Sequence, residues 1–145
     1  MEVLVIDAQG GGIGKQVITA LKKKFSGLTV TAVGTNATAT AAMLKAGADQ
    51  AATGENPVKV CSRRADVIVG PVGIVIADAL LGEITPAMAV AVGQSRAKRI
   101  LIPVNHCDNF IAGVPDLSTA RLIGSVVEEI GRLSGEEKGF HKSAE

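Results

Sequence analysis

The stretch that decides the fold is Met1-Glu2-Val3-Leu4-Val5-Ile6-Asp7-Ala8-Gln9-Gly10-Gly11-Gly12-Ile13-Gly14-Lys15, at the start of the chain. Its first seven residues are a nearly continuous aliphatic run, which is typical of a strand buried on both faces of a parallel sheet. The run ends in a glycine cluster rather than in a hairpin turn, and from Ile13 to Lys24 the apolar residues recur at helical spacing. The stretch therefore predicts a central strand, a glycine-rich turn and a helix.

The same succession of strand and helix recurs along the chain. Further strands are predicted at Leu28–Val33, Ala48–Ala52, Ala65–Val69 and Arg99–Val104, and further helices at Ala37–Ala46, from Asn56 and Pro57 onward, and at Ile74–Leu81, Thr85–Arg96 and Ser118–Leu133. Phe110–Val114 is expected to be an antiparallel hairpin partner at the sheet edge. This alternation indicates an α/β sandwich of three layers with a mainly parallel, doubly wound sheet. Residues 1–134 are predicted to form one domain, and residues 135–145 a charged, flexible tail.

Length and composition narrow the class of protein. The chain has 145 residues, which fits a single domain. It carries 15 basic and 14 acidic side chains, so it lacks the positive field that nucleic-acid binding usually needs. The longest apolar run, Val67–Ala77, contains glycine and proline and is too short for a membrane helix. With two cysteines and no secretory signal, a cytoplasmic location is expected.

The glycine-rich turn is the strongest candidate for a binding site. Glycines let the backbone approach a ligand closely, and free N–H groups at a helix N-terminus attract anions. Ligands of doubly wound sheets bind outside the carboxyl ends of the strands, where this turn is expected to lie. The predicted site residues belong to the turn or follow other strands: Gly10, Gly11, Gly12, Gly14, Lys15, Asn36, Glu55 and Asn105. The expected ligand is a nucleotide, a dinucleotide or another phosphorylated small molecule.

Known glycine patterns match this turn only in part. Gly12-Ile13-Gly14 resembles the end of the short-chain dehydrogenase turn, but the chain has no tyrosine to act in that family's catalysis. The segment Gly11–Lys15 resembles the P-loop of partition-type ATPases, yet Gly10 and Gln16 replace their signature lysine and the hydroxyl that holds magnesium. The turn also resembles that of aspartate phosphatases, but Gln9 stands in place of their second aspartate. The dehydrogenase activity is excluded, and the other two are not favoured.

Other cofactors and reactive groups have weaker support. No acidic residue follows the second strand where an NAD-binding acid is expected, and no Trp or Tyr is present to stack on a flavin. His106 and Cys107 are adjacent in an extended loop and point apart, which disfavours a nucleophilic pair. No metal site is predicted, because the two cysteines are far apart in the sequence.

Two further hypotheses about function stay open. One is a hydrolase or transferase that uses Asp7 or Glu83 as acid or base, although Asp7 is better explained as an anchor for the loop. The other is a non-catalytic sensor or self-associating module, because Ala- and Gly-rich helices allow close contact between chains. This second hypothesis predicts a homo-oligomer.

Several short motifs, taken together, resemble one family. They are Asp7-x-Gln9-Gly10-Gly11-Gly12-Ile13-Gly14-Lys15, Gly34-Thr35-Asn36-Ala37, Ala52-Thr53-Gly54-Glu55-Asn56, Gly70-Pro71-x-Gly73-Ile74 and Gly82-Glu83-x-Thr85-Pro86. As a set they resemble a small uncharacterised bacterial family, classed as a domain of unknown function, over almost the whole chain before the tail. The resemblance implies a Rossmann-like fold, but it brings no activity, substrate or catalytic residue.

Overall fold

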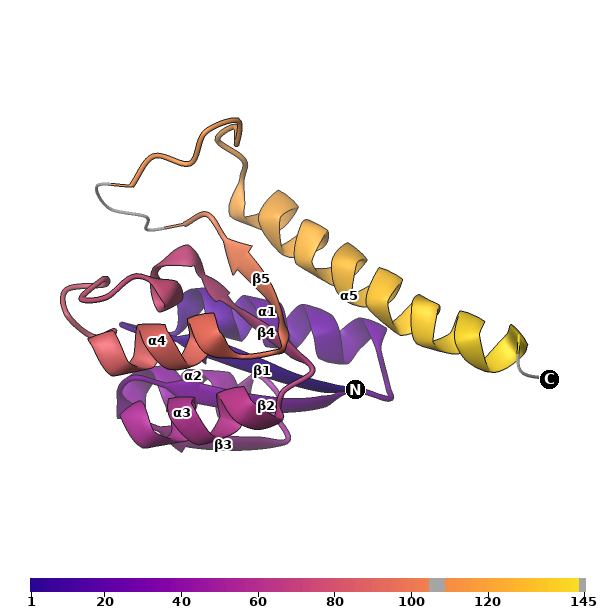
Figure 1. Cartoon of the computed structure of the whole chain (residues 1–145), viewed down its shortest axis with the longest axis horizontal. Helices are drawn as coiled ribbons and strands as arrows, with labels where there is room; N and C mark the ends of the chain where they lie inside the picture. The colour runs from indigo at the N-terminus through magenta and orange to yellow at the C-terminus, as the bar shows by residue number, and fades with distance from the viewer. Residues whose placement is uncertain (105–108, 144–145) are drawn as a thin grey trace.

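The computed structural model describes residues 1–104 and 109–143, with side chains up to residue 135. In this part of the chain, a five-stranded sheet is flanked by α-helices on both faces (Figure 1). The strands are β1 (Glu2–Asp7), β2 (Thr29–Gly34), β3 (Gln50–Thr53), β4 (Val67–Pro71) and β5 (Lys98–Ile102). The helices are α1 (Gly12–Lys24), α2 (Ala37–Lys45), α3 (Glu55–Arg64), α4 (Pro86–Gln94) and α5 (Thr119–Ser143), with a short 3-10 helix η1 (Val72–Val75) after β4.

The sheet has the strand order β3-β2-β1-β4-β5, and every neighbouring pair is parallel. β1 pairs with β2 along its whole length, from Glu2 opposite Thr29 to Asp7 opposite Gly34. The chain builds outward from β1 to β3 and then crosses back to β4 and β5. This is the order of a Rossmann-like sheet, and it confirms the predicted doubly wound α/β class.

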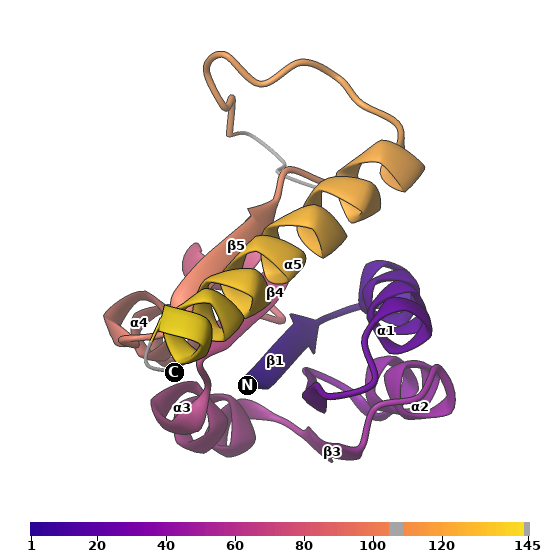
Figure 2. The ribbon, with the colours of Figure 1, turned by 90° about the vertical axis from the view of Figure 1, so that its right-hand side faces the viewer.

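Two hydrophobic layers enclose the central strand. Helices α1, α2 and α5 cover one face of the sheet, and α3 and α4 cover the other (Figure 2). Alternate residues of β1 divide between the layers: Val3 and Val5 pack on the α1 side, and Leu4 and Ile6 on the α3 side. Each of the four is at most 1% exposed. The strand is therefore buried on both faces, as its aliphatic sequence predicts.

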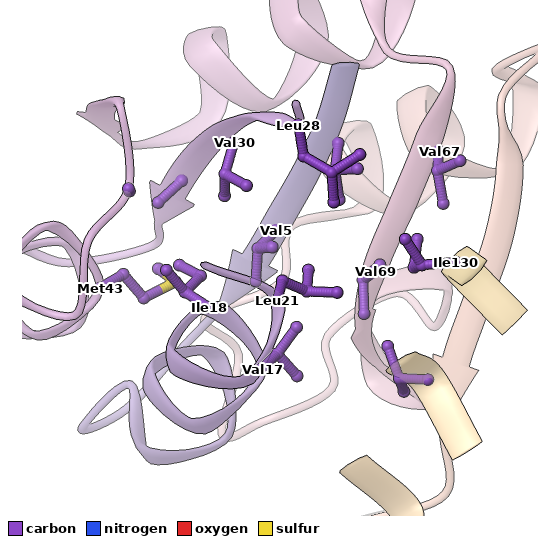
Figure 3. Packing of buried hydrophobic residues seen from close by; sticks show 14 of the residues in the cluster. Val5, Val17, Ile18, Leu21, Leu28, Val30, Met43, Val67, Val69 and Ile130 are labelled. Atoms are coloured by element: carbon purple, nitrogen blue, oxygen red, sulfur yellow. The ribbon is translucent and has the colours of Figure 1, made fainter. Parts of the chain in front are cut away.

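The layer beside α1 shows why the helix forms on this stretch of sequence. Val17, Ile18 and Leu21 are fully buried and lie against Val5 and the neighbouring strands (Figure 3). Each contributes roughly 1.5–3 kcal/mol by leaving water. The cations Lys22, Lys23 and Lys24 stand in the last turn, where they suit the negative end of the helix. The aliphatic core requires no Trp or Tyr.

The antiparallel strand expected at Phe110–Val114 does not form. This segment contains a turn at Gly113, whose φ is +77°, closed by a hydrogen bond from Val114 N–H to the Ile111 carbonyl. Phe110 is 88% exposed, so it covers no sheet face. A strand is stabilised by packing of a half-buried face, which this segment lacks.

The prediction of a helix at Ile74–Leu81 is also wrong. It is replaced by η1 and a compact loop, in which Asp78, Leu80 and Leu81 adopt positive φ values of 57–64°. The loop is closed by a hydrogen bond of 2.7 Å from Asp78 N–H to the Ile84 carbonyl. The left-handed residues end any helix, since a helix needs an unbroken right-handed backbone.

Two helix boundaries differ from the expectation. α3 begins at Glu55 with Gly54 as its N-cap, so Asn56 lies inside the first turn and does not cap the helix. α5 continues past Leu133 to Ser143, because the helix-forming residues of this extension outweigh the cost of its two glycines, Gly135 and Gly139. The flexibility expected of residues 135–145 stays a prediction. Within the described ranges, no helix is both long and apolar enough to cross a bilayer.

Candidate functional site

The candidate site lies where the connections of two neighbouring strands diverge. β1 and β4 are adjacent, but β1 continues into α1 on one face of the sheet and β4 leads to α4 on the other. Ligands of doubly wound sheets bind outside the carboxyl ends of the strands at such a point. The two segments that meet there are the glycine-rich turn after β1 and the loop between β4 and α4.

Two of the four glycines in the turn are required by packing. Gly11 has a φ of +72°, and a Cβ on it would lie 2.9 Å from the backbone of Ala39 in α2. A Cβ on Gly14 would lie 2.5 Å from the sulfur of Met43 and 3.0 Å from the Cβ of Asp7. Gly11 and Gly14 therefore let α1 approach α2 and β1 closely, a role that explains them without any ligand.

The other two glycines face open space. A Cβ on Gly10 or Gly12 would meet no heavy atom within 4 Å. Neither backbone N–H donates to a protein acceptor in the part of the chain that the structure describes. A cavity of about 190 Å³ lies beside them, lined by residues 7–13, Gln16, Pro71 and Leu80. Gly12 is the first residue of α1, so this N–H stands at the positive end of the helix.

Asp7 anchors the turn from the end of β1. Its carboxylate accepts hydrogen bonds from Ala8 N–H at 2.8 Å and from Gly14 N–H, in the third position of α1, at 2.7 Å. The side chain is only 6% exposed. Burial raises the pKa of Asp7 above its usual value, with a further contribution from the charge of Glu83, and the hydrogen bonds from Gly14 and Ala8 oppose the rise. These contacts agree with the predicted anchoring role.

Glu83, in the loop before α4, ties the ends of β1 and β2 together. Its carboxylate accepts from the N–H of Gln9 at 3.0 Å, from the hydroxyl of Thr35 at 2.7 Å and from the side-chain amide of Asn36 at 2.7 Å. Burial raises the pKa of Glu83, but the hydrogen bonds from Thr35, Gln9 and Asn36 outweigh it and hold the pKa below its usual value. Glu83 is thus an ionised bridge across the carboxyl edge of the sheet.

The structure does not bring all the predicted site residues to one place. Gly10, Gly11 and Gly12 line the cavity. Asn36 caps α2 by accepting from Ala39 N–H at 2.9 Å, and its side-chain amide donates to Glu83 at 2.7 Å. Glu55 accepts from the hydroxyl of Thr85 at 2.5 Å, between the starts of α3 and α4.

Gly14 is buried and Lys15 is exposed on α1, and neither is among the residues that line the cavity. Asn105 lies outside the described residues. In the described ranges, no three His, Cys, Asp or Glu side chains are grouped closely enough to hold a metal ion.

Sequence reasoning missed two residues that line the cavity and one contact at this edge of the sheet. Gln16 lines the cavity one helical turn after Gly12, a spacing that could have identified it. Leu80 lines the same cavity from a loop that was expected to be a helix. The spacing of apolar residues therefore could not predict that Leu80 lies at the cavity. Thr35 donates its hydroxyl to Glu83, whereas the sequence predicts for this residue a hydrogen bond to a phosphate or ribose hydroxyl, or a cap for the next helix.

The strand order and the glycine-rich turn define a Rossmann-like α/β domain with a small cavity at the carboxyl edge of its sheet. A family model described as a domain of unknown function, DUF3842, matches residues 2–134. The chain belongs to this family, as its motifs indicate.

No curated protein matches the chain. Among solved structures, the chain is similar to the crystal structure of a dodecameric FMN-dependent UbiX-like decarboxylase from Escherichia coli O157:H7. The two are 13% identical with a TM-score of 0.45, over 90% of this chain and 94% of the other.

Proposed function

We propose that the protein binds a small phosphate-bearing molecule at the glycine-rich turn, with the phosphate on the N–H groups of Gly10 and Gly12. The observation that carries this proposal is that both N–H groups border a cavity and have no protein acceptor among the described residues. They stand at the positive end of a 13-residue helix, which favours an anion. Asp7 accepts from the N–H of Gly14, the third residue of α1, so the N–H of Gly12, the first residue, is left for the ligand.

The size of the cavity favours a small ligand over an extended dinucleotide. Its volume of about 190 Å³ lies below the range of roughly 300–1,000 Å³ that encloses a whole drug-sized ligand. A cavity of this size would hold the phosphate and the ligand atoms bonded next to it. Glu83 fills the space between the ends of β1 and β2 through its bonds to Gln9, Thr35 and Asn36. A dinucleotide that contacts the end of β2 would have to displace it.

A thermal-shift panel tests this function. Inorganic phosphate, ribose 5-phosphate, AMP and NAD are each added at millimolar concentration, and a phosphate monoester is expected to raise Tm. Gly12→Leu should abolish the shift without unfolding the protein, because a side chain at this position meets no protein atom near its Cβ. Gly124→Leu, at an equally open glycine of α5, is the matched control and should keep the shift. No ligand raising Tm, or a shift that survives Gly12→Leu, would contradict the proposal.

Self-association is the second candidate, favoured by two large apolar side chains on the surface. Leu81 is 95% exposed and Phe110 is 88% exposed. Light scattering over a range of protein concentrations tests this candidate. A monomer at the highest concentration would remove it, and Leu81→Ser with Phe110→Ser should lower the mass of any oligomer.

A further inference from the structure

A second cavity lies away from the glycine-rich turn, in the groove between α3 and α4. These two helices lie side by side on one face of the sheet (Figure 1). The cavity has a volume of about 530 Å³ and is lined by α3, α4 and the turn that follows α4. It shares no residue with the cavity at the turn. Its volume is in the range of small-molecule sites.

The groove combines positive charge with an apolar wall. Lys59 and Arg63 of α3 and Arg96 after α4 line it, and no carboxylate does. None of the three cations is in an ion pair with a described residue. Val90, which is 52% exposed, and neighbouring alanines of α4 form the apolar wall. Such a groove fits an anion that carries an apolar body.

Ser62, one of the residues that line the groove, carries a buried hydroxyl without a partner. Ser62 is 1% exposed, and its Oγ has no hydrogen-bond partner in the described structure. Buried hydroxyls normally find one, because leaving them unpaired costs free energy.

Two backbone carbonyl groups near this hydroxyl have hydrogen-bond donors. The Ser95 hydroxyl donates to the Ser62 carbonyl at 2.6 Å, and Arg99 donates to the Ser95 carbonyl at 2.6 Å. Neither donor is a partner of the Ser62 hydroxyl, which stays unpaired.

We propose that this groove binds a small organic anion with an apolar body, such as an aromatic carboxylate, sulfonate or phosphate ester. The guanidinium groups of Arg63 and Arg96 bind the anionic group, with Lys59 adding charge. The apolar body packs against Val90 and the alanines of α4. The Ser62 hydroxyl supplies a polar contact at the base of the groove. This site is independent of the phosphate site proposed at the turn.

Two fluorescent probes with the same rings test the proposal. 8-Anilinonaphthalene-1-sulfonate carries the anionic group, and N-phenyl-1-naphthylamine lacks it. The double variant Arg63→Gln/Arg96→Gln should weaken binding of the sulfonate at least tenfold and leave the neutral probe within twofold. The control Arg64→Gln changes an arginine on the same helix that lines a different cavity, and it should leave both affinities within twofold. Circular dichroism confirms that each variant is folded.

Ser62→Ala separates a binding role from a structural one. Removing a buried, unpaired hydroxyl should leave Tm unchanged or raise it, while the sulfonate binds about threefold more weakly. The proposal is overturned if the sulfonate does not bind, or if the double variant binds it as tightly as the unmodified protein. It is equally overturned if Gly12→Leu, rather than the arginine variants, removes sulfonate binding, because the probe would then lie at the turn.

Discussion

The turn between β1 and α1 has two sides that contrast sharply. On the inner side, Gly11, Gly14 and Asp7 are buried and in contact with α2 or with the start of α1. On the outer side, Gly10 and Gly12 are exposed beside a cavity, and no protein atom lies where their Cβ atoms would be. Packing explains the inner glycines but gives no reason for the outer ones. The outer side is therefore where a ligand accounts for the sequence best.

The largest effect is expected at the inner side, from Gly11→Ala. The new Cβ would meet the backbone of Ala39 at 2.9 Å, and alanine would be held at a φ of +72°. Backbone strain and overpacking together should lower the free energy of unfolding by roughly 3 kcal/mol. Urea denaturation measures this loss. Gly113→Ala is the control, since Gly113 has a φ of +77° but open space around it, and should lose only about 1 kcal/mol. Equal losses would show that contact with α2 is unimportant.

Asp7→Asn should have the next largest effect. An asparagine oxygen can accept from either Ala8 or Gly14, but not from both, so one buried N–H loses its acceptor. The expected loss is about 2 kcal/mol in urea denaturation. Asp116→Asn, in an exposed loop, is the control. The thermal shift caused by inorganic phosphate should grow in Asp7→Asn, because a negative charge is removed from the cavity. A smaller shift in the folded variant would give Asp7 a direct part in ligand binding.

Glu83→Gln tests the network that joins the two strand ends, with an expected loss of about 1 kcal/mol at pH 7. Because the pKa of Glu83 is lowered in the folded protein, its stabilising effect is present above the unfolded pKa of about 4.3 and is lost as pH falls through the folded value. The difference between the variant and the unmodified protein should therefore shrink below about pH 4. Glu128→Gln, on the exposed side of α5, is the matched control. A difference that stays constant from pH 7 to pH 3 would rule out an ionised bridge.

The smallest effect on stability is expected at the outer side, from Gly12→Ala. Its Cβ would enter open space in the first position of α1, so unfolding should change by no more than about 0.5 kcal/mol. A loss above about 1 kcal/mol in urea denaturation would mean that the outer side is also fixed by packing, and the contrast between the two sides would fail.

Most of the fold could be predicted because burial leaves a clear pattern in the sequence. The run Val3–Ile6 and the helical spacing of Val17, Ile18 and Leu21 identify a buried strand and its helix. The failures fall where apolar residues do not pack as their pattern predicts. Phe110 is exposed, and Leu80 and Leu81 adopt left-handed backbone in a loop closed by its own hydrogen bonds.

The candidate site was predictable only in its location. The glycine cluster after β1 marks the turn, but sequence cannot separate Gly11 and Gly14 from Gly10 and Gly12, because the difference depends on how closely α2 approaches. The role of Glu83 depends on contacts with residues that are 47 to 74 positions away in the chain. Long-range contacts of this kind leave no local pattern.

The proposed phosphate site depends on the N–H groups of Gly10 and Gly12. Amide chemical shifts, measured by NMR while ribose 5-phosphate is added, test it most directly, with ribose as the control that lacks the phosphate. We expect the Gly10 and Gly12 signals to show the largest saturable shifts with ribose 5-phosphate and none with ribose. Unchanged signals at both glycines, or equal shifts with ribose, would contradict it.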